Sequence, residues 1–267
     1  MKSLQEKLET IIAAAGGQWG VVVEEINGSF YWEHNTTQTF AAESIIKVPI
    51  MAAVFDAASK GNVRFDQAVR MKQTDQVAGS GVMQHLTPDA HYPVYDLITL
   101  MIIQSDNTAT NMLIDLIGED QVRLTMAELG MHDSCYSRKL MLYPADSPPN
   151  NMITAGDIAR MLKRLATGTF LGEHACRQMI GIMKKQQVRN ALPARLPRIE
   201  EGVSDAAAVW EMANKTGWDT GRQHDVGILF AGGKAYSLTA LSENAPPDAS
   251  LQAMAAIGYE VYRCAVS

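Results

Sequence analysis

The sequence predicts an α+β fold: an antiparallel sheet flanked by N- and C-terminal helices, with a large all-helical domain inserted between its strands. Three observations lead to this prediction. Strand patterns occur near both ends of the 267-residue chain, apolar residues at helical spacing fill the middle, and neither group of strands could bury its apolar face alone. The sheet domain would comprise residues 1–42 and 200–267, and the inserted helical domain residues 43–199.

The N-terminal segment predicts a helix followed by a β-hairpin. Apolar residues recur at helical spacing within residues 1–17, with charged residues between them. Residues 20–26 and 29–34 have strand character, and Asn27-Gly28 between them is the strongest short signal for a hairpin turn.

Helical patterns dominate from residue 44 to about residue 192. Long apolar helical runs cover residues 45–58, 94–104 and 107–117. A further helix begins after Thr154, because threonine is a favoured N-cap residue and the acidic Asp157 follows in the first turn.

Strands return near the C-terminus, and an apolar helix closes the chain. The three strands and this helix are expected at residues 209–216, 225–231, 235–242 and 250–264. We expect the N-terminal hairpin to join these strands in one antiparallel sheet, some 180 residues away in sequence.

Composition limits the class of protein. The chain is 47% hydrophobic and 19% charged, with a net charge of −6 and a sequence pI of about 5.5. It therefore offers no electrostatic reason to expect nucleic acid or an anionic membrane as a partner. No apolar run reaches the roughly 18 residues of a membrane-spanning helix, and residues 1–17 lack the continuous apolar stretch of a secretory signal. As written, the chain is expected to be cytoplasmic and monomeric.

Cysteine and histidine usage gives no sign of a metal site or a disulfide framework. The 3 cysteines form no C-x-x-C pair, and the 6 histidines show no ligand spacing. We therefore expect neither a metal nor a cofactor.

Three short motifs carry the chemistry. In chain order they are Ser44-Ile45-Ile46-Lys47, Ser105-Asp106-Asn107 and Lys215-Thr216-Gly217. With average residue usage, the first pattern is expected by chance roughly once in a chain of this length, and each of the others in about one chain in twenty. Their joint occurrence in this order argues against coincidence.

The first motif suits nucleophilic catalysis. Ser44 and Lys47 would lie one turn apart on one helix face. A serine hydroxyl needs a base to take its proton, and a lysine amine can do so only when neutral. Burial and a second cation such as Lys215 both lower a lysine pKa. Simple capping or turn roles for residues 44–47, 105–107 and 215–217 remain open, but they do not explain why the motifs occur together.

With these motifs in place, the chain resembles the class A β-lactamases and the wider penicillin-recognising serine hydrolases. The likeness covers nearly the whole chain and includes residues 107–111 and 225–227. It implies a β-lactamase/transpeptidase-like fold with the active site between the helical and the sheet domain.

The resemblance also implies a role for each motif residue. Ser44 would be the acylated nucleophile and Lys47 its proton acceptor. Ser105 would relay a proton to the leaving nitrogen, and Asn107 would orient Lys47 and the substrate amide. The backbone N–H groups of Ser44 and Trp218 would form the oxyanion hole.

The same resemblance places the substrate carboxylate beside the third motif. Lys215 and Thr216 would bind it, next to Gly217. A further basic residue that family members often carry on the following strand is absent, and Arg222 or His224 could substitute for it.

One departure from the family concerns deacylation. Class A enzymes carry a loop glutamate, two residues after an arginine, that activates the deacylating water. Counted from Gly130, the arginine is Arg138, and Leu140 stands at the glutamate position. Asp146 lies in the right loop but at another position, and it is the candidate base. The acylation machinery is thus expected to be present and the deacylation machinery to be missing or rebuilt.

The resemblance favours β-lactam ring opening through an acyl-enzyme that turns over slowly, with a small-molecule substrate. Two alternatives stay open, because a fold does not by itself specify a reaction. One is a D,D-peptidase or esterase acting on small acyl substrates. The other is a penicillin-binding or sensor protein that is acylated without turnover.

Overall fold

The computed structural model describes residues 3–141, 149–197 and 210–267, and it confirms the α+β fold class. Within these residues the helices are α1 (Leu4–Ala15), α2 (Lys47–Ser59), α3 (Val94–Ile103), α4 (Asn107–Ile117), α5 (Glu119–Glu128), α6 (Ala155–Ala166), α7 (Glu173–Lys184) and α8 (Pro247–Val266). The short 3₁₀ segments are η1 (Glu43–Ile46), η2 (Gln73–Asp75) and η3 (Met83–His85). The strands are β1 (Gln18–Glu25), β2 (Tyr31–His34), β3 (Thr39–Ala41), β4 (Ala68–Arg70), β5 (His91–Pro93), β6 (Met152–Thr154), β7 (Trp210–Asp219), β8 (Arg222–Ala231) and β9 (Lys234–Glu243).

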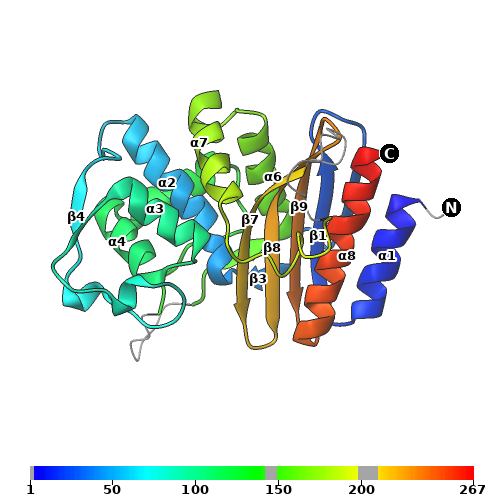
Figure 1. Ribbon diagram of the computed structural model, residues 1–267, viewed down its shortest axis with the longest axis horizontal. Helices are drawn as coiled ribbons and strands as arrows, with labels where there is room; N and C mark the ends of the chain where they lie inside the picture. Colours follow the sequence, from blue (N-terminus) through cyan, green and yellow to red (C-terminus); the bar gives the residue numbers. More distant parts are fainter. Residues whose placement is uncertain (1–2, 142–148, 198–209) are drawn as a thin grey trace.

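The main sheet joins the two ends of the chain. It has five antiparallel strands in the order β2-β1-β9-β8-β7, and β1 pairs with β9 along its whole length. This arrangement confirms the prediction that the N-terminal hairpin and the C-terminal strands share one sheet (Figure 1). The predicted hairpin is also present, and Asn27 in its connection has a φ of 61°, a left-handed conformation that asparagine tolerates better than most residues.

Helices cover both faces of this sheet. The terminal helices α1 and α8 pack together over one face (Figure 1), where Trp19 and Val21 of β1 share one buried apolar cluster with Met254 and Ile257 of α8. Helix α6 packs on β1, β8 and β9 from the other side. Because both faces are covered, β1 is buried without the alternation of a half-exposed strand.

The helical part of the chain is built around α2. Nearly every residue of α2 is buried, and α3, α4, α5 and α7 pack around it. A helix that is apolar on all sides is stable only when it is surrounded, because exposing its apolar surface to water costs about 25 cal/mol per Å². The N-terminus of this central helix therefore has a well-defined position next to β7.

Two predicted strands were too short. β7 continues beyond residue 216 to Asp219, and β8 already begins at Arg222, so that the hairpin turn contains only Thr220 and Gly221. The added residues have no strand-like apolar alternation, and they pair across the hairpin, so backbone pairing extends the strands. The short ribbons β3–β6 and β4–β5 were not predicted, since three-residue strands leave little periodicity to detect.

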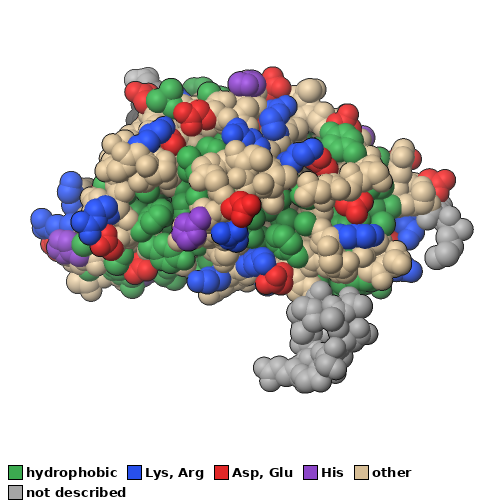
Figure 2. Space-filling view, turned by 90° about the horizontal axis from the view of Figure 1, so that it is seen from above, with side chains coloured by type: hydrophobic (Ala, Val, Ile, Leu, Met, Phe, Trp, Pro, Cys, Tyr) green, Lys and Arg blue, Asp and Glu red, His purple; other side chains and the backbone are tan. Residues whose placement is uncertain are grey.

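The face of the molecule in Figure 2 carries Lys and Arg side chains interspersed with Asp and Glu. Among the residues that the structure describes, no helix combines the length and the apolar character needed to cross a membrane.

Candidate active site

Ser44 lies in η1, the 3₁₀ turn that leads directly into α2. Glu43, the residue before it, has a φ of 44°, in the left-handed region that a non-glycine residue enters at a cost of about 1–2 kcal/mol. The turn places Lys47 close to Ser44, with its Nζ 3.1 Å from the serine Oγ.

Lys47 is fully buried in a cage of oxygen atoms. Its Nζ lies 2.6 Å from the carbonyl oxygen of Ser105, 3.0 Å from the Oγ of that serine and 2.7 Å from Oδ1 of Asn107. Burial, and then the positive charge of Lys215, lower the pKa of Lys47 well below its usual value, while the Asp106 carboxylate opposes the shift. A neutral amine at this place would accept a hydrogen bond from the Ser44 hydroxyl.

Ser105 connects two lysine side chains. Its Oγ accepts hydrogen bonds from Nζ of Lys47 and of Lys215, each at 3.0 Å. Its φ of 54° is again left-handed, and strain of this kind is typical of functional sites.

The two residues after Ser105 hold it in place. The Asp106 carboxylate caps α4 by accepting from the backbone N–H of Ala109 at 2.9 Å, and it also accepts from the N–H groups of Val82 and Met83. Asn107 donates from Nδ2 to the Ala78 carbonyl at 3.1 Å while its Oδ1 accepts from Lys47. The helix-capping role that the sequence left open for this motif is therefore correct for Asp106. The Asn107 side chain instead binds Lys47.

Lys215 projects from β7, the edge strand of the sheet next to η1. It is fully buried, and burial lowers its pKa to about 7, while the Asp225 carboxylate opposes the shift. The neighbouring Thr216 is also buried, and among the described residues its Oγ1 has no hydrogen-bond partner.

Gly217 makes the close contact between β7 and the serine turn possible. A Cβ atom at this position would lie 2.9 Å from the backbone nitrogen of Ser44 and 3.1 Å from that of Ile45. These distances are shorter than ordinary van der Waals contact, so any larger residue would push the strand and the turn apart.

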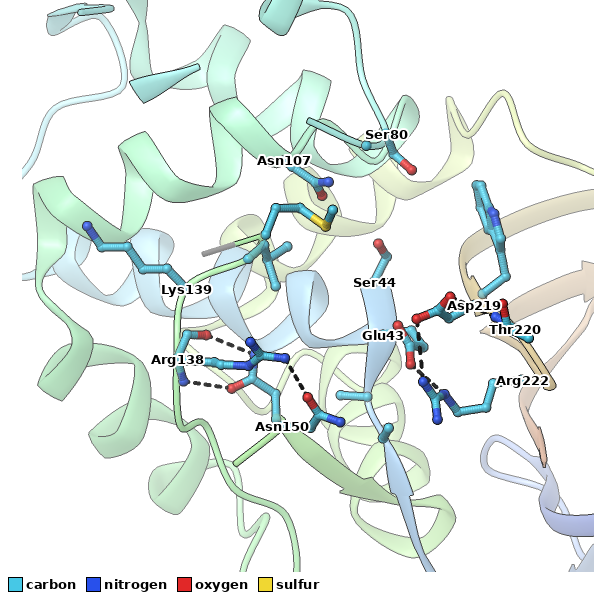
Figure 3. A pocket seen from close by; sticks show the side chains of 17 residues that line it. Glu43, Ser44, Ser80, Asn107, Arg138, Lys139, Asn150, Asp219, Thr220 and Arg222 are labelled. Atoms are coloured by element: carbon cyan, nitrogen blue, oxygen red, sulfur yellow. Dashed lines mark hydrogen bonds and ion pairs between the residues drawn. The ribbon is translucent and has the colours of Figure 1, made fainter. Parts of the chain in front are cut away.

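A cleft of about 650 Å³ opens at Ser44 (Figure 3). Of the residues predicted from the sequence, Ser44, Asn107, Trp218, Arg222 and Leu140 line it. The other motif residues, Lys47, Ser105 and Lys215 to Gly217, do not line the cleft. A chain of hydrogen bonds connects Lys215 to Ser105, Ser105 to Lys47, and Lys47 to Ser44.

The Leu140 side chain lines the cleft, at the position where the resemblance to class A enzymes predicts a glutamate. Two hydrogen bonds to Asn111 hold its backbone: Leu140 N–H donates to Oδ1 at 2.9 Å, and Nδ2 donates to the Leu140 carbonyl at 2.8 Å. Asn151 holds the adjacent backbone through Ser137 and Arg138. Asp146, the predicted alternative base, lies outside the described residues.

Arg222 and His224 do not lie as the sequence suggested. Arg222 lines the cleft, but its guanidinium already binds the Glu43 carboxylate at 2.6 Å (Figure 3). His224 is buried and does not line the cleft, since Nε2 faces the Ala41 carbonyl at 2.9 Å and Nδ1 accepts from the N–H of Ser242 at 3.2 Å. The prediction that His224 could bind substrate is therefore wrong.

Sequence reasoning missed Glu43 and the two asparagines that hold the wall of the cleft, Asn111 and Asn151. Asn111 had a weak signal, because it stands one helical turn after Asn107 on α4. Glu43 had none, since its partner is 179 residues away. Within the described parts of the chain, no group of three or more His, Cys, Asp or Glu side chains is arranged to hold a metal ion.

Comparisons with known proteins agree with this geometry. The model of the family described as "Beta-lactamase enzyme family" matches residues 3–265. The chain is 27% identical over 239 residues to β-lactamase CTX-M-97 of Escherichia coli, covering 85% of this chain and 76% of that protein. It is 25% identical over 242 residues to a β-lactamase of Proteus vulgaris, covering 85% and 74%.

Solved structures match a larger share of this chain than these sequence relatives do. A β-lactamase from Sphaerobacter thermophilus has a TM-score of 0.88 and 32% sequence identity, covering 97% of this chain and 96% of that one. PBP-A has a TM-score of 0.83 and 23% identity, covering 98% and 95%, and shows the fold alone. Because the family model spans almost the entire chain and residues of the three motifs are in contact around Ser44, this chain belongs to the β-lactamase enzyme family.

Proposed function

We propose that this protein is a serine hydrolase that opens β-lactam rings through an acyl-enzyme on Ser44. One observation carries the proposal: a buried lysine amine, whose pKa is strongly lowered, lies 3.1 Å from a serine hydroxyl at an open cleft. Such an amine can take the serine proton near neutral pH. The relatives from Proteus vulgaris, Escherichia coli and Sphaerobacter thermophilus are named β-lactamases, which supports the same reaction.

Acylation would proceed as follows. The Oγ of Ser44 attacks the carbonyl carbon of the ring amide while its proton passes to Nζ of Lys47. The backbone N–H groups of Ser44 and Trp218 donate to the oxyanion that forms. When the C–N bond breaks, Ser105, hydrogen-bonded to both lysines, transfers a proton to the leaving nitrogen, and a proton from Lys47 replaces it.

We assign the substrate carboxylate to the end of β7. Lys215 would supply positive charge, and the Thr216 hydroxyl, without a partner among the described residues, would donate a hydrogen bond beside Gly217. Lys215 keeps its charge only below its lowered pKa of about 7, so binding of the carboxylate should weaken as the pH rises through that value.

Deacylation would be slow, because the Leu140 side chain has no group that can deprotonate a water molecule. Asp146 stays the proposed alternative base. The same observation favours a second candidate function, a penicillin-binding protein that is acylated without turnover. A leucine-to-glutamate variant of PBP-A is known as an acyl-enzyme complex with penicillin G, which concerns that protein but shows that such an adduct can be isolated.

Intact-mass spectrometry after mixing with penicillin G tests the proposal. We expect a mass increase of one penicillin, mapped to the peptide that contains Ser44, and no increase for Ser44→Ala. Lys47→Gln should slow adduct formation by about 10²–10⁴-fold, the usual contribution of a general base. An adduct on another residue, or unchanged labelling of Ser44→Ala, would refute the assignment. Decay of the wild-type adduct over hours separates slow hydrolysis from acylation without turnover.

The division into residues 1–42 plus 200–267 and 43–199 is likewise our proposal. It is supported by the joining of both chain ends in the main sheet, although α6 of the second segment packs on that sheet. A monomeric state and a cytoplasmic location remain predictions.

A further inference from the structure

The Arg222 side chain is surrounded by carboxylates from three different segments. Its Nε lies 2.6 Å from Oε1 of Glu43, one terminal nitrogen lies 3.4 Å from Oδ2 of Asp219, and the other lies 3.6 Å from Oε1 of Glu243. The Arg222 side chain is about three-quarters buried, and the Glu43 side chain is buried slightly more. Two nitrogens of Arg222 therefore donate within the protein, Nε to Glu43 and a terminal nitrogen to Asp219.

Two of the carboxylates that bind Arg222 stand next to the proposed oxyanion-hole residues in the sequence. Glu43 directly precedes Ser44, and Asp219 directly follows Trp218. These are the two residues whose backbone N–H groups would form the oxyanion hole. Figure 3 shows Glu43, Asp219 and Arg222 converging beside Ser44. One side chain thus binds the neighbour of each of the two amides.

We propose that Arg222 is a positioning residue that sets the spacing of the two oxyanion-hole N–H groups by binding Glu43 and Asp219 together. This inference rests on the proposed function, because it concerns the same acylation step. It replaces the expectation that Arg222 binds the substrate carboxylate.

The geometry explains why such a contact is needed. The serine turn belongs to the helical segment and Trp218 to the edge strand of the sheet, so no backbone pairing of η1 with β7 fixes their distance. Glu43 must also stay in a left-handed conformation, which is unfavourable without a compensating contact. At the same time, Gly217 lets the strand approach to within contact of the Ser44 nitrogen. An ion pair that draws Glu43 toward the hairpin stabilises both features.

Misplacing an oxyanion-hole N–H group should lower the acylation rate strongly. Displacing one oxyanion donor, or shifting reacting groups by about 1 Å, typically costs 10²–10³-fold in rate. The loss should appear in the acylation rate constant at saturating substrate and not in the half-saturation concentration, since the donors act mainly on the transition state.

The experiment measures acylation by penicillin G in stopped-flow for wild type, Arg222→Gln, Glu43→Gln and the double variant. Each single substitution should lower the acylation rate constant by about 10²-fold, with half-saturation changed less than about threefold. The double variant should be no slower than either single one, because both break one contact. Arg222→Lys should retain more activity than Arg222→Gln, since it keeps the charge.

A matched control comes from the Lys7–Glu260 pair. It has the same 2.6 Å separation and similar burial, and it links α1 to α8 on the far face of the sheet. Lys7→Gln should leave the acylation rate constant unchanged while lowering the midpoint of thermal unfolding by a similar amount.

Several results would overturn the proposal. An unchanged acylation rate constant in folded Arg222→Gln would do so, and so would a raised half-saturation concentration alone, which would make Arg222 a substrate ligand. An equal loss in Lys7→Gln would show a general stability effect. If Arg222→Gln does not fold, the acylation rate constants of Arg222→Lys and Glu43→Gln test the proposal instead. Failure of wild-type acylation would instead refute the proposed function itself, so the two failures are distinguishable.

Discussion

Two buried lysine amines share the hydroxyl of Ser105, so the charge on each depends on the other. A charged Lys215 lowers the pKa of Lys47 and helps to keep it neutral as a base. The charge on Lys215 depends in turn on Asp225, a buried carboxylate on β8 that accepts from Asn214 Nδ2 at 2.9 Å and from the Leu192 N–H at 2.9 Å. Acylation should therefore respond to a residue that contacts neither Ser44 nor the cleft.

Asp225→Asn tests this dependence. Removal of the negative charge lowers the pKa of Lys215 below its value of about 7, so Lys215 loses its proton at a lower pH. The alkaline decline of kcat/KM for penicillin G should then move to lower pH, mainly through a higher KM. Asp157→Asn removes another buried carboxylate, outside the cleft, and should leave the profile in place. Superimposable profiles for wild type and Asp225→Asn would contradict the coupling.

At the scale of elements, the wall of the cleft is a short loop that α4 holds through Asn111 and through the ion pair of Asp115 with Lys139. Both hydrogen bonds of Asn111 go to the backbone of Leu140, so they do not depend on which side chain stands there. The loop should keep its position when residue 140 is substituted, and its chemistry can be changed without rebuilding it.

Leu140→Glu should therefore accelerate deacylation. A carboxylate at this wall can deprotonate a water molecule if it reaches within about 3 Å of it, and a general base typically contributes about 10²–10⁴-fold. We expect a burst of product followed by slow turnover for wild type, and a faster steady rate for the variant. Leu140→Gln, similar in shape but not basic, is the control. Equal steady rates for the Glu and Gln variants would show that the carboxylate does not act as a base.

For the whole molecule, His224 connects three parts of the structure. From β8 its imidazole bonds the Ala41 carbonyl of β3 and the Ser242 N–H of β9. These contacts require a proton on Nε2 and a lone pair on Nδ1, which is the neutral ring. Burial accordingly lowers the pKa of His224 from 6.5 to about 4.

Acid should therefore destabilise the fold through this residue. The unfolded chain binds a proton at His224 below about pH 6.5 and the folded chain only below about 4, so the free energy of unfolding falls as the pH drops between these values. At pH 4.5 the loss from this group is about 2–3 kcal/mol. Urea unfolding at pH 7 and pH 4.5 should show a smaller decrease for His224→Gln than for wild type. The raised pKa of Asp225, about 7, acts in the opposite direction in both proteins and cancels in the comparison. Equal decreases would exclude His224 as the cause.

Local patterns were enough to predict most of the fold. The Asn27-Gly28 turn, the apolar runs of α2, α3 and α4 and the alternation of strands and helices follow from neighbouring residues, because turn conformation and helical periodicity are local properties. The three motifs were visible in the same way. The sequence by itself therefore determined the order of the strand and helical blocks, the shared sheet and the three motifs that lie near Ser44.

Other features depend on residues far apart in the chain. The lowered pKa of Lys47 requires burial and a second lysine 168 positions later, and the partner of Arg222 is 179 positions away. The extra length of β7 and β8 comes from pairing with each other, and the ribbon β3–β6 joins segments with no strong strand signal. Charge state, ion pairing and strand length at these places are set by the surroundings of a side chain in three dimensions, so only the tertiary structure decided them.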